Sequence, residues 1–74
     1  MGKKAQLIGT AAKLYELGRK VEEKREKIRK LVNAGYAYES PEILKALLEY
    51  QKEDEKWKQL EQKYLSLRDE ISRQ

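Results

Sequence analysis

The sequence predicts an all-α protein: a two-helix antiparallel hairpin, similar to a coiled coil, that dimerises into a four-helix bundle. Apolar residues recur every seven positions in both halves of the chain, and a single turn-forming segment separates the halves. With the intermediate positions, the recurrence has the three-four spacing of a helix seam. The seam positions are Leu7, Thr10, Leu14, Leu17, Val21, Lys24, Ile28 and Leu31 in the first half, and Ile43, Ala46, Tyr50, Glu53, Trp57, Leu60, Tyr64, Leu67 and Ile71 in the second.

The segment between the halves predicts where one helix ends and the next begins. Gly35 follows the first seam, and glycine adopts the left-handed conformation that commonly ends a helix. Ser40 and Pro41 are a favoured N-cap and a favoured first helical residue. We therefore expect one domain over residues 1–74, with a helix over 4–34, a turn over 35–40 and a helix over 41–72. A connection this short makes the two helices antiparallel neighbours.

Folding the chain back at this turn aligns the two seams. Leu17 then faces Leu60, and Lys24, the charged residue of the first seam, faces Glu53, the charged residue of the second. We expect an ion pair between Lys24 and Glu53, with Arg25 and Asp54 as alternates. Such a pair adds little net stability but favours one register of the helices.

Composition restricts the function. The 74 residues include no Cys and no His, so the commonest nucleophiles, general bases and transition-metal ligands are missing. We expect no enzyme, no cofactor and no metal site. A chain of this size is marginally stable alone, and without disulfides or metals self-association is the remaining aid. Charged residues make up 41% of the chain, which excludes a membrane-spanning helix, and the absence of Cys fits a cytoplasmic protein.

Apolar residues outside the seams are the candidate partner-binding residues, with apolar anchorage as their role. They gather near the N-terminus and near the turn. They are Ile8, Ala12, Tyr15 and Leu65 at one end, Leu44 and Leu48 at the other, and Tyr36 and Tyr38 in the turn. Three interpretations stay open: the core of a self-associated bundle, a docking face for a different protein, and, least favoured, a membrane-surface helix over residues 3–20.

Nucleic acid is a further candidate partner, because the isoelectric point is about 9.3 and residues 20–30 are rich in Lys and Arg. Against it, Glu22, Glu23 and Glu26 interrupt this basic stretch. Trp57 and the neighbouring seam tyrosines lie at heptad spacing, which is typical of core residues and not of a base-stacking surface.

The stretch from Glu26 to Lys52 resembles the bend region of the small sporulation aspartyl-phosphate phosphatases of Gram-positive bacteria. In that family a basic first helix, a Gly-containing turn and a restart like residues 40–45 lead into a Ser-Gln-x-Leu-Asp motif. Here the motif's Ser, Leu and Asp fall on Leu47, Tyr50 and Gln51, so its carboxylate is missing. The resemblance implies a helical hairpin and a non-catalytic relative that binds a response-regulator-like partner.

Taken together, these patterns indicate a small cytoplasmic protein that is not an enzyme. Its function would be protein–protein interaction or regulation, exerted by presenting one face of a helical hairpin.

Overall fold

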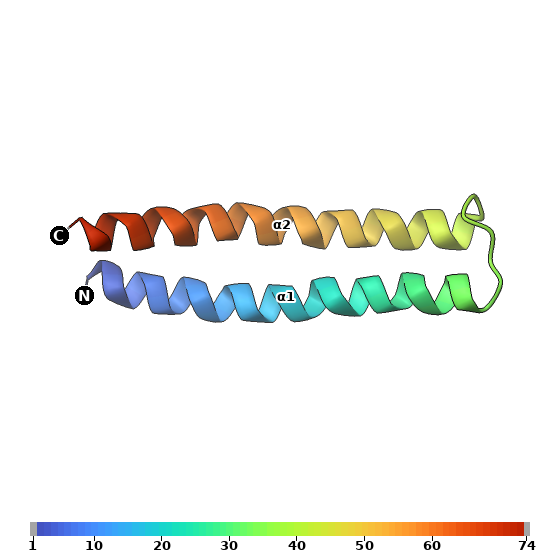
Figure 1. Ribbon diagram of the computed structural model, residues 1–74, viewed down its shortest axis with the longest axis horizontal. Coiled ribbons are helices and arrows are strands. Elements are labelled where there is room, and N and C mark those ends of the chain that lie inside the picture. Colours follow the sequence, from blue (N-terminus) through green and yellow to red (C-terminus); the bar gives the residue numbers. More distant parts are fainter. Residues whose placement is uncertain (1, 74) are drawn as a thin grey trace.

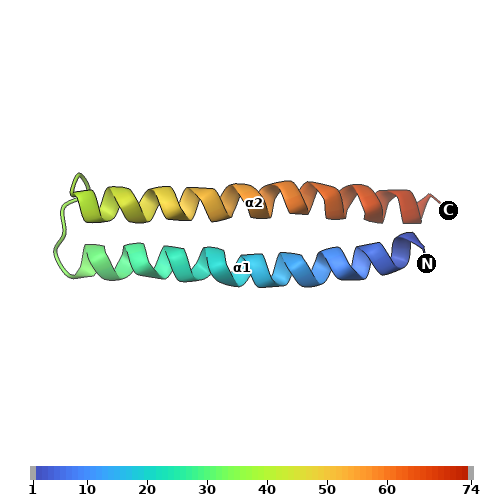
Figure 2. The same cartoon turned by 180° about the vertical axis from the view of Figure 1, so that it is seen from behind.

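The computed structural model, which describes residues 2–73, is a hairpin of two antiparallel helices (Figure 1). Helix α1 spans Lys3–Asn33 and helix α2 spans Pro41–Ser72. They lie side by side over their whole length, and the view from behind shows the same arrangement (Figure 2). The molecule is a rod of 53 × 15 × 15 Å, so the predicted hairpin fold is confirmed.

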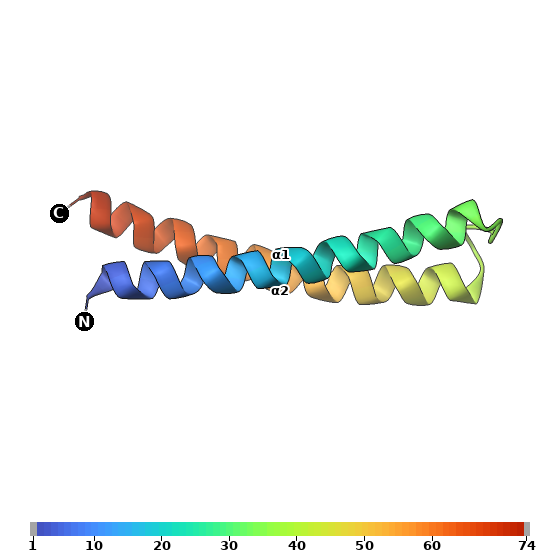
Figure 3. The same ribbon diagram turned by 90° about the horizontal axis from the view of Figure 1, so that it is seen from below.

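The two helices are inclined to each other and cross near the middle of the rod (Figure 3). Both chain ends lie at one end of the rod and the bend lies at the other (Figures 1 and 3). A shallow crossing is expected when side chains spaced three and four residues apart interlock between helices. Each helix contributes residues to both ends of the rod. Because the chain ends lie at one end and the bend at the other, the two ends are formed by different residues.

The bend begins with a Schellman motif that ends α1 at the expected place. Gly35 has a φ of +95°, in the left-handed region. The amide of Gly35 donates to the carbonyl of Val32 at 3.0 Å, and the amide of Tyr36 donates to the carbonyl of Leu31 at 3.2 Å. These two bonds satisfy carbonyls that the end of the helix leaves without intrahelical partners.

A side-chain cap begins α2. The Ile43 amide donates to the Ser40 hydroxyl oxygen at 3.3 Å, and Pro41 is the first helical residue. Glu42 in the first turn places a negative charge near the positive end of the helix dipole. The second helix therefore has the predicted bounds, whereas the first begins and ends one residue before the prediction.

The core between the helices is thin. In residues 2–73 the buried apolar side chains are Val21, Ile43, Ala46 and Leu67. Thr10 is also buried, and its hydroxyl donates to the carbonyl of Gln6 at 2.8 Å. The other large apolar seam residues, Trp57 among them, stay partly exposed. Two helices bury one stripe each, so a hairpin alone covers only part of its apolar surface.

The predicted ion pair between Lys24 and Glu53 is wrong. Lys24 instead lies 3.5 Å from the carboxylate of Glu49, one turn earlier in α2. Lys27 lies 3.3 Å from the same carboxylate, whereas Glu53 pairs with Lys56 inside α2 at 3.8 Å. Because Lys24 and Lys27 are three residues apart on one face of α1, a single carboxylate between them is attracted by both ammonium groups.

Candidate functional site

The hairpin has two flanks, one on each side of the seam, and each flank receives residues from both helices. Gly18 and Arg25 of α1 line one groove together with Asp54 and Trp57 of α2. Residues seven apart share a helix face, so Ala11 and Val32 lie in line with Gly18, and Leu47 lies in line with Asp54. We call this side the apolar flank; its apolar residues are Ile8, Ala11, Tyr15 and Val32 on α1, and Leu44, Leu47 and Leu65 on α2.

Large side chains of the apolar flank are exposed to solvent. Ile8 and Tyr15 are each 71% exposed near the chain ends. Leu44, Leu47 and Leu65 are 50%, 37% and 36% exposed. Exposed apolar residues that gather on one face are typical of an interaction surface.

Charges of both signs occupy the middle of the apolar flank. Arg25 pairs with Glu22 at 3.0 Å, and its guanidinium lies 5.9 Å from the centre of the Tyr50 ring. The hydrogen bond to the Tyr50 hydroxyl, followed by the charge of Glu22, raises the pKa of Arg25. Lys58 pairs with Asp54 at 3.0 Å, and this hydrogen bond raises the pKa of Lys58.

In the middle of the apolar flank, Trp57 of α2 packs against the backbone of α1. Gly18 carries no side chain, and a Cβ added there would lie 3.4 Å from the indole nitrogen of Trp57. Tyr15 and Arg19 line the groove that continues along α1 from this point. The partly exposed indole thus occupies the space that a side chain at position 18 would enter.

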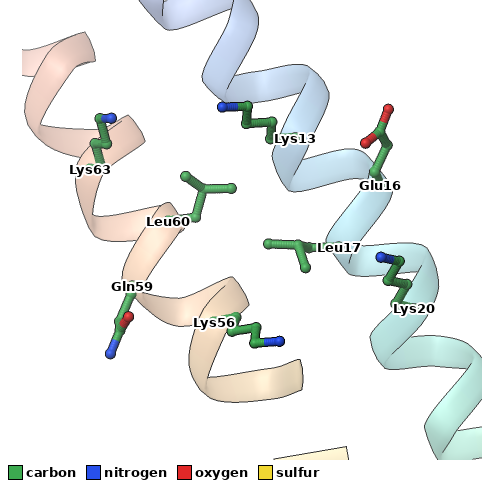
Figure 4. A pocket seen from close by; sticks show the side chains of 8 residues that line it. All are labelled: Lys13, Glu16, Leu17, Lys20, Lys56, Gln59, Leu60 and Lys63. Carbon is green, nitrogen blue, oxygen red and sulfur yellow. The ribbon is translucent and has the colours of Figure 1, made fainter. Parts of the chain in front are cut away.

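The opposite flank contains a groove of different composition, which we call the lysine groove (Figure 4). Leu17 and Leu60 point toward each other across its floor, and four lysines surround them. Its lining consists of Lys13, Glu16, Leu17 and Lys20 from α1, and Lys56, Gln59, Leu60 and Lys63 from α2.

The ends of this second flank are electrostatically paired, unlike its middle. Lys27 donates a hydrogen bond to Glu49 at 3.3 Å near the bend, and Lys3 lies 3.3 Å from Glu70 near the chain ends. The hydrogen bond from Lys27, followed by the charge of Lys24, lowers the pKa of Glu49 below its ordinary value of 4.5. Cross-helix pairs of opposite charge therefore bracket the four lysines.

The structure separates the residues that the sequence indicated as partner-binding. Ile8, Tyr15, Leu44 and Leu65 occupy the apolar flank. Ala12 and Leu48 are exposed but lie on the backs of α1 and α2, half a turn away from the seam. Tyr36 and Tyr38 lie in the bend, where Tyr38 is 74% exposed. The structure thus gathers four of the eight on the flank proper.

Sequence reasoning missed Leu47 and the four lysines of the groove. Leu47 was considered only as a position in a motif, yet it continues the line of Asp54 on the apolar flank. The lysines had a signal: two lie four before and three after Leu17, and two lie four before and three after Leu60. The predicted facing of Leu17 and Leu60 places all four around one point.

Within the described part of the chain, no group of three or more acidic side chains is arranged to hold a metal ion. Neither α1 nor α2 is long and apolar enough to cross a membrane. Comparisons with protein-family models, with curated proteins and with solved structures each find no match. The arguments for function therefore come from the two flanks themselves.

Proposed function

We propose that this chain is a cytoplasmic protein–protein interaction or regulatory module, without enzymatic activity of its own, that works as a homodimer of hairpins. The observation that carries the proposal is the set of exposed large apolar side chains on one flank, two of which, Ile8 and Tyr15, are 71% exposed. A chain of 74 residues with so thin a core gains stability when a partner covers such a surface.

The charges on the apolar flank favour a second copy of this chain as the partner that covers it. The middle of the apolar flank carries both signs, with Arg25 and Lys58 beside Glu22 and Asp54. A surface with both signs can complement itself across a two-fold axis, where residue i contacts residue j and j contacts i. The lysine groove cannot do so, because two copies joined there would bring lysines against lysines.

The side chains at the two ends of the flank support an antiparallel arrangement of the two hairpins. The end near the bend carries the leucines Leu44 and Leu47. The other end carries Ile8 and Tyr15, with the small Ala11 between them. An antiparallel dimer sets Leu47 of each copy on Ala11 of the other, and the four helices then enclose both seams.

Mass and cross-linking test this proposal. The dimer should sediment at twice the 8.8 kDa of the chain at micromolar concentration. Because the protein contains no Cys, the double variant Ala11→Cys/Leu47→Cys introduces the only two thiols. These positions lie toward opposite ends of the 53 Å rod, so a disulfide between them must join two copies.

We expect mixed Ala11→Cys and Leu47→Cys single variants to form the cross-linked heterodimer in preference to either homodimer. Ala12→Cys mixed with Leu47→Cys is the matched control, because Ala12 lies on the back of α1. Homodimers of Ala11→Cys as the main product would show a parallel dimer instead. A monomeric mass for a well-folded protein at hundreds of micromolar would refute the self-association.

A further inference from the structure

The lysine groove departs from the charge pattern of its own flank. At the two ends of that flank, cross-helix pairs join Lys3 to Glu70 and Lys27 to Glu49. In the middle, both helices present lysine, two from α1 and two from α2. Like charges that face each other across a helix pair disfavour the pairing. The hairpin thus carries, at its centre, an arrangement that its own folding does not favour.

The charge of the groove is not neutralised within the molecule. In residues 2–73, Lys13, Lys20 and Lys63 form no ion pair, and Lys56 forms only the 3.8 Å pair with Glu53. Glu16 is the one acidic residue of the lining, and it points away from the groove (Figure 4). Lys13 and Lys56 extend toward the gap between the helices. A positive rim therefore stands open around the two leucines.

The leucine floor narrows the class of ligand. Phosphate chains are recognised by charge and by polar or stacking groups, and none of the residues that line the groove is aromatic. Leu17 and Leu60 offer instead a partly exposed apolar contact at the centre of the positive rim. An apolar centre with charged edges is the complement of an amphipathic helix.

We propose that the lysine groove binds an acidic amphipathic helix of a different protein. On a helix, the residues three and four positions away on either side of a central residue lie on the same face. A ligand helix with one leucine, and with glutamates at those four positions, would set its leucine on Leu17 and Leu60. Its four carboxylates would then lie toward the four lysines.

This groove is separate from the surface proposed for self-association. The lysine groove lies on the opposite side of the seam from Gly18 and Asp54, so a dimer formed through the apolar flank leaves it open. A dimer of hairpins would present two such grooves facing outward. The two proposals can therefore fail independently, and different substitutions test them.

The probe is a fluorescent, alanine-rich helical peptide of about 18 residues, long enough to be helical in part. It carries one leucine with glutamates at the four neighbouring face positions. One control peptide has the same composition, with the glutamates moved to the opposite face. A second control peptide replaces each glutamate with glutamine. Fluorescence anisotropy with the 74-residue chain measures binding of each peptide.

We expect the designed peptide to bind at least tenfold more tightly than either control, a difference of about 1.4 kcal/mol. Raising the salt concentration to 0.5 M should weaken binding of the designed peptide, because salt screens exposed charges. Lys20→Gln/Lys56→Gln should weaken binding about tenfold. Lys45→Gln/Lys52→Gln removes the same charge from outside the groove and should change binding less than twofold. The helical circular dichroism and the dimer mass should be the same in both variants.

Three results would overturn the proposal. Equal binding of the designed and the rearranged peptide would show that only net charge matters. Tighter binding of a single-stranded RNA homopolymer than of the peptide, lost in Lys20→Gln/Lys56→Gln, would assign the groove to nucleic acid. Dissociation of the dimer by the same variant would make the groove part of the self-association surface.

Discussion

The two flanks of this hairpin share one seam and one backbone, but they differ in apolar exposure and in charge. The apolar flank exposes Ile8 and Tyr15 at one end and leucines at the other, with charges of both signs between them. The opposite flank, which contains the lysine groove and which we call the lysine flank, has cross-helix ion pairs at both ends. In its middle, four lysines surround two leucines. The seam positions make the helices associate, and the positions beside the seam decide what else can bind.

The largest expected effect comes from a charge placed on the apolar flank. Leu47→Glu does this at the position where the proposed dimer sets the leucine on Ala11 of the second copy. We expect the dimer dissociation constant to rise about a hundredfold or more, near 3 kcal/mol, as for a central interface residue. A concentration series in sedimentation equilibrium measures it. Gln62→Glu adds the same charge on the back of α2, away from the seam, and should leave the dimer intact. Equal dissociation of the two variants would remove Leu47 from the interface.

The next largest effect concerns the bend, which brings the two helices together and on which both flanks therefore depend. Gly35→Ala forces a β-carbon into a left-handed conformation with a φ of +95°. We expect the hairpin to lose about 1–2 kcal/mol of unfolding free energy. Gly9→Ala, inside α1 where an added Cβ meets nothing within 4 Å, should gain up to about 1 kcal/mol. Urea denaturation followed by circular dichroism compares the two; an increase in stability for Gly35→Ala would contradict the assigned conformation.

A smaller effect is expected for a substitution in the lysine groove that changes stability and peptide affinity in opposite directions. Lys56→Glu places a carboxylate opposite Lys20 and converts a repulsive contact into a cross-helix ion pair. We expect the hairpin to become more stable by about 0.2–1 kcal/mol while the designed acidic peptide loses affinity. Lys52→Glu, an equal change in charge outside the groove, should leave both properties close to those of the wild type. A loss of stability in Lys56→Glu would show that the lysines do not repel each other in the folded hairpin.

The smallest effect concerns the paired end of the same flank and depends on pH. The pKa of Glu49 is lowered in the folded protein, so its contribution to stability is present above the ordinary pKa of 4.5 and is lost as the pH falls through the folded value. The unfolding free energy should therefore fall between pH 7 and pH 3 by more in the wild type than in Glu49→Gln. Glu39→Gln, in the exposed bend, is the control. Equal pH profiles for the wild type and Glu49→Gln would show that the pair with Lys27 contributes nothing in solution.

Much of the fold could be predicted, because its determinants are local. Gly35, Ser40 and Pro41 act through the conformation of their own backbone or through bonds to near neighbours, and the helix ends lie within one residue of the predicted positions. The seams follow from periodicity alone. The ion pair of Lys24 could not be predicted in the same way. Its partner depends on where a long flexible side chain finds a carboxylate, and Glu49 is one helical turn from the expected residue.

The same distinction between local and long-range determinants applies to the two candidate surfaces. Ile8, Tyr15, Leu44 and Leu65 could be recognised as apolar residues outside the seam, because helical spacing identifies such positions without any knowledge of the partner helix. The lysine groove required both helices at once. Each of its lysines, taken alone, is an ordinary exposed residue on a charged helix.

The sequence by itself determined the helices, the bend and the two matched seams, because each depends on residues that are near one another in the chain. Tertiary structure alone decided which carboxylate Lys24 finds and which lysines of the groove stay without a carboxylate partner. The physical reason is that charge interactions across the seam depend on distances between the two helices, and those distances exist only once the chain has folded back on itself.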